Sequence, residues 1–219
     1  MVLATLYFLG TEFGGIGLGW IALHPGRRPL TAGDQRRAEA AAQDQNAQLS
    51  NVQITTPDGV LLRAWFIRPA QANGSAVILL HGVGDNRLGV YGYGDWLMKN
   101  HYSVLLPDAR AHGLSGGELA TYGIREADDI HEWVNWLEEN HQPSCVFGFG
   151  ESMGAAQLLQ SVLMNRDSVR WLLSHHSRPF AKLPMRDSGV HFIPARGWVG
   201  RSSGRQSKLA FFSFDSSTA

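Results

Sequence analysis

The sequence predicts an α/β fold: a doubly wound, mostly parallel sheet that opens with an antiparallel hairpin. Short continuous apolar runs recur along the chain, as expected for strands that are buried on both faces of a parallel sheet. Stretches with helical periodicity separate these runs, and this alternation is typical of α/β proteins. Ahead of them, two strand-like runs flank Pro57-Asp58-Gly59, which has the composition of a tight turn.

The predicted elements follow this order. The hairpin strands are expected at 52–56 and 60–67. The later strands are expected at 76–80, 103–107, 144–149 and 169–174. Helices are expected at 90–100, 124–140 and 153–165, and in 124–140 the apolar residues repeat every three to four positions.

Composition limits the classes of protein to which the chain can belong. Its 219 residues are 44% hydrophobic and 17% charged, which indicates a globular domain with a sizeable core. The formal net charge is zero, so nothing favours a nucleic-acid partner. The single cysteine, Cys145, excludes an internal disulfide and any cysteine-rich zinc site. Since it stands in an apolar run, we expect it to be a buried hydrophobic residue.

The N-terminus predicts a membrane anchor. Residues 1–23 are almost wholly apolar, and as a helix they would span roughly 35 Å, enough to cross a bilayer. Glu12 opposes insertion, so a buried N-terminal segment is the alternative. Basic residues that follow the segment favour the cytoplasmic side for the main domain. They are Arg27, Arg28, Arg36 and Arg37. We therefore expect a membrane-anchored protein with a cytoplasmic domain.

The remaining boundaries come from shifts in composition. Residues 24–50 are expected to form a linker with a short alanine-rich surface helix, ahead of a core domain over 51–175. Residues 176–219 form an atypical basic tail that is rich in Ser, Arg and Gly, and no glutamate occurs after Glu151. Two interpretations are open: a flexible or disordered basic tail, and a continuation in a shifted reading frame.

A candidate nucleophile stands in the stretch "GFGESMGAA", residues 148–156. The Gly-x-Ser-x-Gly pattern lies between a predicted strand and a predicted helix, as in a nucleophile elbow. Such a sharp turn crowds the backbone, so only small residues fit at Gly150 and Gly154. The turn also places Ser152 at a helix N-terminus, where the helix dipole favours an oxyanion. Ser152 is therefore the predicted catalytic nucleophile.

The loop "HGVGDNR", residues 81–87, follows the first predicted parallel strand and supplies the rest of an oxyanion hole. The two expected donors are the backbone N–H groups of Val83 and Met153. His81 and His112 are interpreted as structural histidines that bond to nearby backbone. Neither pairs with cysteines or carboxylates at metal-ligand spacing. We predict no metal and no cofactor.

Four motifs stand in order along the chain: "HGVGDNR", "DARAHGLSGG", "YGIREADDIHEWVNWL" and "GFGESMGAA". In this order and spacing they resemble the α/β-hydrolase superfamily, in particular the branch with serine aminopeptidase-like and acyltransferase- or thioesterase-like enzymes. The resemblance covers residues 52–175. It implies a serine hydrolase acting on a small-molecule or peptide acyl substrate: Ser152 attacks an ester, thioester or amide carbonyl, and the acyl-enzyme is then hydrolysed.

The same resemblance makes the C-terminal part unusual, since the superfamily places its triad acid and then its histidine after later strands. Too few residues follow Ser152 for two more strand–helix units of about 30 residues each. None of the downstream candidates has the expected order and distance: His175, His176, His191, Asp167, Asp187 and Asp215. We expect the sheet to lack its last strands and the chain to lack the triad acid and base. A non-catalytic α/β-hydrolase-fold binding protein and an acyltransferase are the alternatives.

Overall fold

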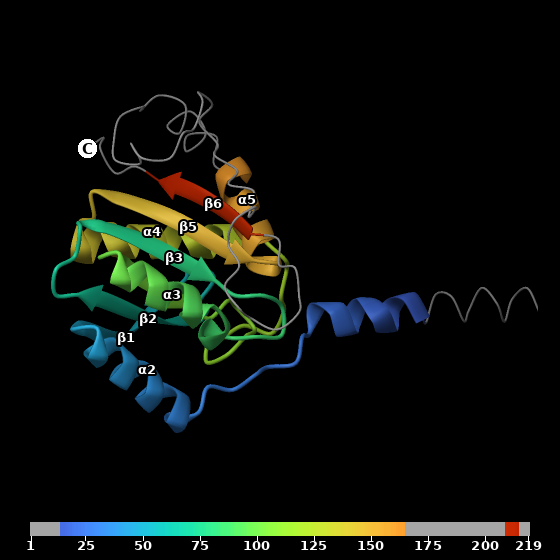
Figure 1. The fold of residues 1–219 in the computed structure, drawn as a ribbon. Helices are drawn as coiled ribbons and strands as arrows, with labels where there is room; N and C mark the ends of the chain where they lie inside the picture. Colours follow the sequence, from blue (N-terminus) through green and yellow to red (C-terminus); the bar gives the residue numbers. More distant parts are fainter. Residues whose placement is uncertain (1–13, 165–208, 215–219) are drawn as a thin grey trace, which may run out of the picture.

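A six-stranded sheet forms the centre of the molecule, in the order β1-β2-β4-β3-β5-β6 (Figure 1). The structure, a computed structural model, describes residues 14–164 and 209–214. The strands are β1 (Ala47–Thr55), β2 (Leu61–Pro69), β3 (Ser75–Leu80), β4 (Ser103–Pro107), β5 (Cys145–Glu151) and β6 (Leu209–Phe214). β3 pairs in parallel with β4 and with β5, while β2 joins β4 antiparallel. The predicted α/β-hydrolase fold class is confirmed.

The opening hairpin is formed as predicted. β1 and β2 pair antiparallel from Ala47 opposite Pro69 to Thr55 opposite Leu61. In the turn, the Thr56 N–H donates to the Val60 carbonyl at 3.0 Å. Gly59 has a φ of 82°, a conformation that glycine adopts without steric cost. The Pro-Asp-Gly signal therefore marks the turn correctly.

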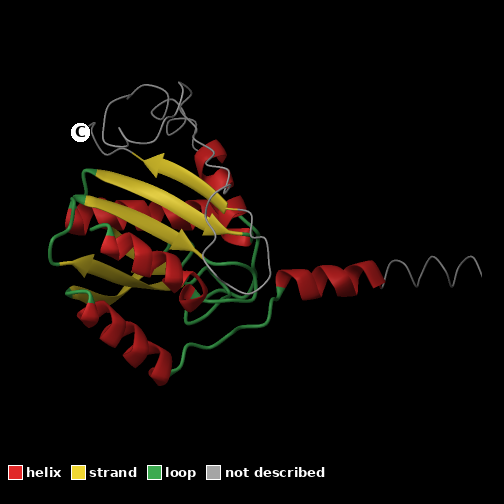
Figure 2. Ribbon diagram, viewed as in Figure 1, coloured by secondary structure: helices red, strands yellow, loops and turns green. Residues whose placement is uncertain are grey.

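Helices cover both faces of the sheet (Figures 1 and 2). α2 (Ala32–Asp44) and α3 (Tyr91–Lys99) share one hydrophobic cluster with one face of the strands, and a 3-10 turn (Arg87–Val90) precedes α3. α4 (Glu126–His141) and α5 (Met153–Met164) share a second cluster with the other face. Val77 of β3 belongs to the first cluster and Ile78 to the second. Because neighbouring residues of a strand point to opposite faces, each continuous apolar run contributes side chains to both clusters.

β6 was not predicted. It pairs antiparallel with β5, from Val146 opposite Phe214 to Glu151 opposite Leu209. These residues belong to the predicted basic tail, in which no strand was expected. The run "LAFFSF" is rich in aromatic residues, which favour strands, but it is too short and isolated to be decisive on its own. The strand predicted at 169–174 lies outside the described residues.

The predicted membrane anchor and membrane localisation are wrong. Among residues 14–164 and 209–214, no helix is long and apolar enough to span a bilayer. The described helix of this region covers residues 14–23, and Pro25-Gly26 follows its end. Figure 1 shows this helix pointing away from the rest of the domain.

The predicted linker contains regular structure. α2 begins with a capping box, in which the Asp34 N–H donates to the Thr31 hydroxyl while the Asp34 carboxylate accepts from the Thr31 N–H. Its buried face consists of Ala38 and Ala42, small residues that let the helix lie close to the sheet. The predicted alanine-rich helix is thus present at 32–44.

Candidate active site

Ser152 stands alone between a strand and a helix. β5 ends at Glu151 and α5 begins at Met153, so a single residue makes the turn. Ser152 has a φ of 52°, in the left-handed region, and its side chain is exposed. Such a conformation costs a non-glycine residue about 1–2 kcal/mol. A strained serine at a strand–helix junction is the geometry of a nucleophile elbow.

The glycines of the elbow are required by close backbone contacts. A Cβ added to Gly150 would lie 2.4 Å from the carbonyl carbon of Gly154. A Cβ added to Gly154 would lie 2.4 Å from the carbonyl oxygen of Leu80, at the end of β3. The start of α5 therefore packs directly onto the neighbouring strands, and any side chain at either glycine would displace the turn.

The predicted oxyanion loop lies against this elbow. A Cβ on Gly82 would stand 3.7 Å from the Ser152 Cβ and 3.8 Å from the Glu151 carbonyl oxygen. β3 and β5 are parallel neighbours, so the loops that follow them meet at one edge of the sheet. Val83 is 46% exposed on this loop, and Met153 is the first residue of α5. The N–H groups of a first helical turn have no acceptor within the helix.

His81 and His112 bond to backbone, as interpreted from the sequence. His81 Nδ1 lies 2.8 Å from the Gly82 carbonyl oxygen, and the Ala109 N–H donates to His81 Nε2 at 3.1 Å. These two partners fix a neutral ring with its proton on Nδ1. Burial lowers the pKa of His81, in agreement with this tautomer. His112 Nδ1 lies 2.9 Å from the Arg110 carbonyl oxygen, and its side chain is buried.

Asp108, which the sequence analysis did not single out, joins the loops after β3 and β4. Its fully buried carboxylate accepts from the Arg87 N–H at 2.8 Å, from Arg87 Nη2 at 2.7 Å and from the Leu114 N–H at 2.7 Å. The Arg87 side chain is 2% exposed and lies over the Trp65 ring. Its position in the sequence could have identified it, because Asp108 directly follows a buried parallel strand and so lies at the edge of the sheet where active sites form.

Two carboxylates near the elbow were also missed. Glu151 precedes the nucleophile, and Asp85 lies on the oxyanion loop. Burial raises the pKa of Glu151, and the negative charge of Asp85 raises it further. Arg28 donates to the Asp85 carboxylate at 2.8 Å. The site therefore carries negative charge that one arginine partly offsets.

No described side chain pairs with Ser152 as a base. Within residues 14–164, no hydrogen bond joins the Ser152 hydroxyl to a histidine. The downstream candidates lie outside the described residues: His175, His176, His191, Asp167, Asp187 and Asp215. The absence of a triad acid and base therefore stays a prediction.

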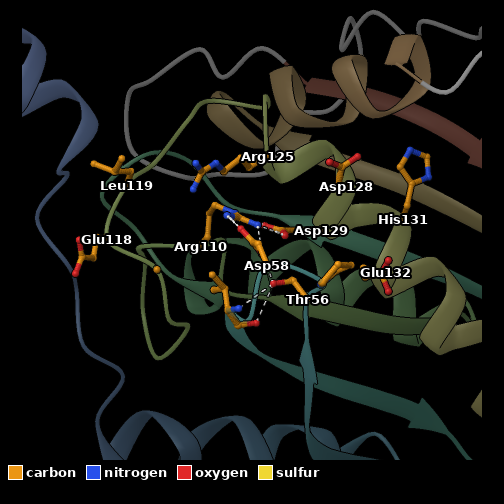
Figure 3. A pocket seen from close by; sticks show the side chains of 13 residues that line it. Thr56, Asp58, Arg110, Glu118, Leu119, Arg125, Asp128, Asp129, His131 and Glu132 are labelled. Atoms are coloured by element: carbon orange, nitrogen blue, oxygen red, sulfur yellow. Dashed lines mark hydrogen bonds and ion pairs between the residues drawn. The ribbon is translucent and has the colours of Figure 1, made fainter.

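A pocket of about 720 Å³ lies elsewhere, between the β1–β2 turn, the loop after β4 and α4 (Figure 3). Arg110 is held at its centre between Asp129, to which Nε donates at 2.7 Å, and Asp58, to which Nη1 donates at 2.9 Å. The Arg110 hydrogen bond lowers the pKa of Asp58 to about 2. No lining residue comes from 81–87 or from the elbow. Among the described residues, no cluster of histidine, cysteine or carboxylate side chains could hold a metal.

Comparison with known proteins agrees with this geometry. Residues 71–177 match the family model described as serine aminopeptidase, S33. The esterase Pf2001 of Pyrococcus furiosus is 29% identical in sequence, with a TM-score of 0.54, over 69% of this chain and 53% of the esterase chain. The described part of the chain therefore has the α/β-hydrolase fold, and residues 71–177 are similar to the serine aminopeptidase family.

Two curated relatives match shorter stretches. The uncharacterized protein YqkD of Bacillus subtilis is 36% identical over 86 residues, 39% of this chain. The polyketide transferase grgF of a Penicillium species is 32% identical over 94 residues, 42% of this chain. The matched stretches span 28% and 32% of these relatives, so the chain corresponds to about a third of each.

Proposed function

We propose that the chain carries the nucleophile of a serine hydrolase. The Ser152 oxygen attacks the carbonyl carbon of an ester, a thioester or an amide. The bond to the alcohol, thiol or amine breaks, that group leaves with the hydroxyl proton of the serine, and an acyl-enzyme remains. Water then hydrolyses the acyl-enzyme to a carboxylic acid and free Ser152. The observation that carries the proposal is the left-handed Ser152 at the start of α5, facing the loop after β3.

The backbone N–H groups of Val83 and Met153 are the proposed oxyanion donors. The tetrahedral intermediate places a negative charge on the former carbonyl oxygen, and two converging donors would stabilise it. A Cβ added to Gly82 would stand 3.7 Å from the Ser152 Cβ, so the loop that carries Val83 lies close to the elbow. Met153 opens α5, and the positive end of the helix dipole supports the same charge.

We propose further that this chain reacts slowly, because it does not itself supply a triad acid and base. A nucleophile that keeps its oxyanion hole but lacks its base retains about 10³–10⁴-fold acceleration over water, far below a complete triad. The proposal rests on the order and spacing of the histidines and aspartates that follow Ser152 in the sequence.

Acyl transfer to an acceptor other than water is the second candidate. It is favoured by the similarity to a protein named as a polyketide transferase. Formation of the acyl-enzyme is the same in both reactions, but an amine, thiol or alcohol instead of water then attacks the acyl-enzyme. The two candidates differ only in which nucleophile accepts the acyl group.

A fluorophosphonate probe tests the proposal directly. Because the proposed nucleophile keeps its oxyanion hole but lacks its base, we expect slow labelling at Ser152 in the full chain, detected by mass spectrometry, and none in Ser152→Ala. We also expect slow release of p-nitrophenol from p-nitrophenyl acetate that Ser152→Ala lacks, with acyl transfer to an added amine or thiol if the second candidate holds. An unlabelled wild-type Ser152 would overturn the proposal and favour a binding protein with this fold.

A further inference from the structure

Residues 22–28, here called the strap, comprise the last two residues of the N-terminal helix and the chain that leads from it toward α2 (Figure 1). The strap precedes α2, and its residues from 24 onward belong to the predicted linker. It contacts two loops that are far apart in the sequence. One is the loop after β4, and the other is the loop after β3 that lies against the nucleophile elbow.

The contacts with the loop after β4 involve charged and backbone groups. Arg27 Nη1 donates to the Ser115 carbonyl at 2.5 Å, and Nη2 donates to the Gly117 carbonyl. The Leu23 carbonyl accepts from the Ala120 N–H at 2.9 Å. The two nitrogens of Arg27 thus reach two different carbonyls, which requires the planar fork of a guanidinium.

The contacts with the loop after β3 involve one residue of the strap. Asn86 Nδ2 donates to the Arg28 carbonyl at 3.1 Å, and the Asn86 side chain is almost fully buried. Asn86 Oδ1 in turn accepts from the Leu88 N–H at 2.9 Å. The Arg28 side chain donates to Asp85 at 2.8 Å. The backbone carbonyl of Arg28 therefore binds Asn86, and its side chain binds Asp85, the neighbouring residue on the loop that carries Val83.

We infer that the strap is a positioning element of the Ser152 site, which holds residues 82–88 against the elbow. This inference rests on the proposed function for its chemical consequence. A loop anchored by Asn86 and Asp85 presents the Val83 N–H to the elbow before substrate arrives, so no reorganisation is required as charge develops. Arg27 fixes the strap to the opposite loop, and so gives Arg28 a rigid base.

Charge gives Arg28 a second effect. Without it, the Asp85 carboxylate stands unpaired near the elbow, where it already raises the pKa of Glu151. An unpaired negative charge disfavours the negative oxygen of the tetrahedral intermediate. Any positive side chain that reaches Asp85 should offset this charge. The geometric role of Arg27 has no such substitute.

Four variants of the full chain separate these effects. Arg27→Lys keeps the charge but loses the fork, Arg28→Lys keeps the ion pair, and Arg28→Ala removes it. Arg37→Ala is the matched control, because Arg37 is an exposed arginine of α2 that pairs with Asp34. The first readout is hydrogen exchange of peptides covering 81–90 and 115–123, with β3 as the internal reference. The second is the rate of fluorophosphonate labelling at Ser152.

We expect Arg27→Lys and Arg28→Ala to speed exchange in 81–90 without change in β3, and to slow labelling about three- to fivefold. Arg28→Lys and Arg37→Ala should match the wild type in both readouts. Unchanged exchange in 81–90 overturns the inference whether or not Ser152 reacts. Faster exchange with an unchanged labelling rate also overturns it. If wild-type Ser152 does not react, the proposed function fails, and the exchange data alone decide whether the strap holds the loop.

Discussion

Arg87 and Asp108 form a buried ion pair that is the firmest polar link between the loops after β3 and β4. Both side chains are almost completely buried, and the carboxylate also accepts two backbone N–H groups. Buried charges are stable only when they are paired and hydrogen-bonded, so each partner depends on the other. The exposed pair of Lys99 and Asp95 on α3 is the natural comparison.

Asp108→Asn should therefore destabilise the protein strongly. The substitution leaves the Arg87 guanidinium buried without a counter-charge, at a cost of about 3–5 kcal/mol. Lys99→Met, which removes an exposed pair, should cost less than about 1 kcal/mol. Urea denaturation followed by circular dichroism measures both free energies of unfolding. Equal effects of the two substitutions would contradict the importance assigned to the buried pair.

Elements with a strong pattern were predictable, and those that depend on distant partners were not. The continuous apolar run at 103–107 predicts β4 to the residue, because its side chains are buried on both faces. The apolar period of 124–140 predicts α4, which spans Glu126–His141. β6 lacks any such pattern, since its stabilisation comes from the backbone of β5. The membrane-anchor prediction rested on composition alone: residues 1–23 are apolar, but no helix among the described residues is long and apolar enough to span a bilayer.

The pairing of β6 with β5 gives a prediction for two adjacent positions. Alternate N–H groups of a strand point toward its partner, and β6 is the last strand of the described sheet. Only one of the two adjacent residues Phe211 and Phe212 therefore directs its N–H toward β5. Substituting that residue by proline should lower the thermal midpoint, and substituting the other should lower it much less. Differential scanning fluorimetry, with light scattering to detect association through the freed β5 edge, tests this. Two proline variants as stable as the wild type would refute the pairing.

Across the whole molecule, the site is assembled from segments whose proximity no local pattern reveals. Ser152 and the loop after β3 were predictable, because parallel strands bring their carboxyl ends to one edge. The strap was not, since Arg27 contacts Ser115 across 88 positions and Arg28 contacts Asp85 across 57. Sequence reasoning finds residues whose neighbours along the chain fix their role. It misses residues whose role comes from packing between distant segments.

The global stability should depend on pH through His81. Burial lowers its pKa in the folded state, whereas the unfolded chain takes up a proton near pH 6.5. The unfolded state therefore binds more protons below pH 6.5, and the free energy of unfolding falls as the pH decreases. In His81→Gln this decrease between pH 6.5 and 5 should be smaller, by at most about 1.4 kcal/mol per pH unit.

Denaturant titrations of both proteins over the pH range test this linkage. Above pH 7.5 His81 is neutral in the folded and unfolded states, so the two stability curves should run parallel there. This range serves as the internal control for any general loss of stability in the variant. Identical slopes of the two proteins between pH 6.5 and 5 would show that His81 takes no part in the pH dependence.

At position 152, the residue that would best suit the backbone conformation is not the residue that the proposed reaction needs. At a φ of 52°, glycine would have a lower conformational energy than serine, but glycine has no hydroxyl. A selection for heat resistance alone would drive position 152 toward glycine and remove the proposed nucleophile. Engineering of this scaffold should therefore seek added stability elsewhere, for example in the β1–β2 hairpin, and hold residue 152 fixed.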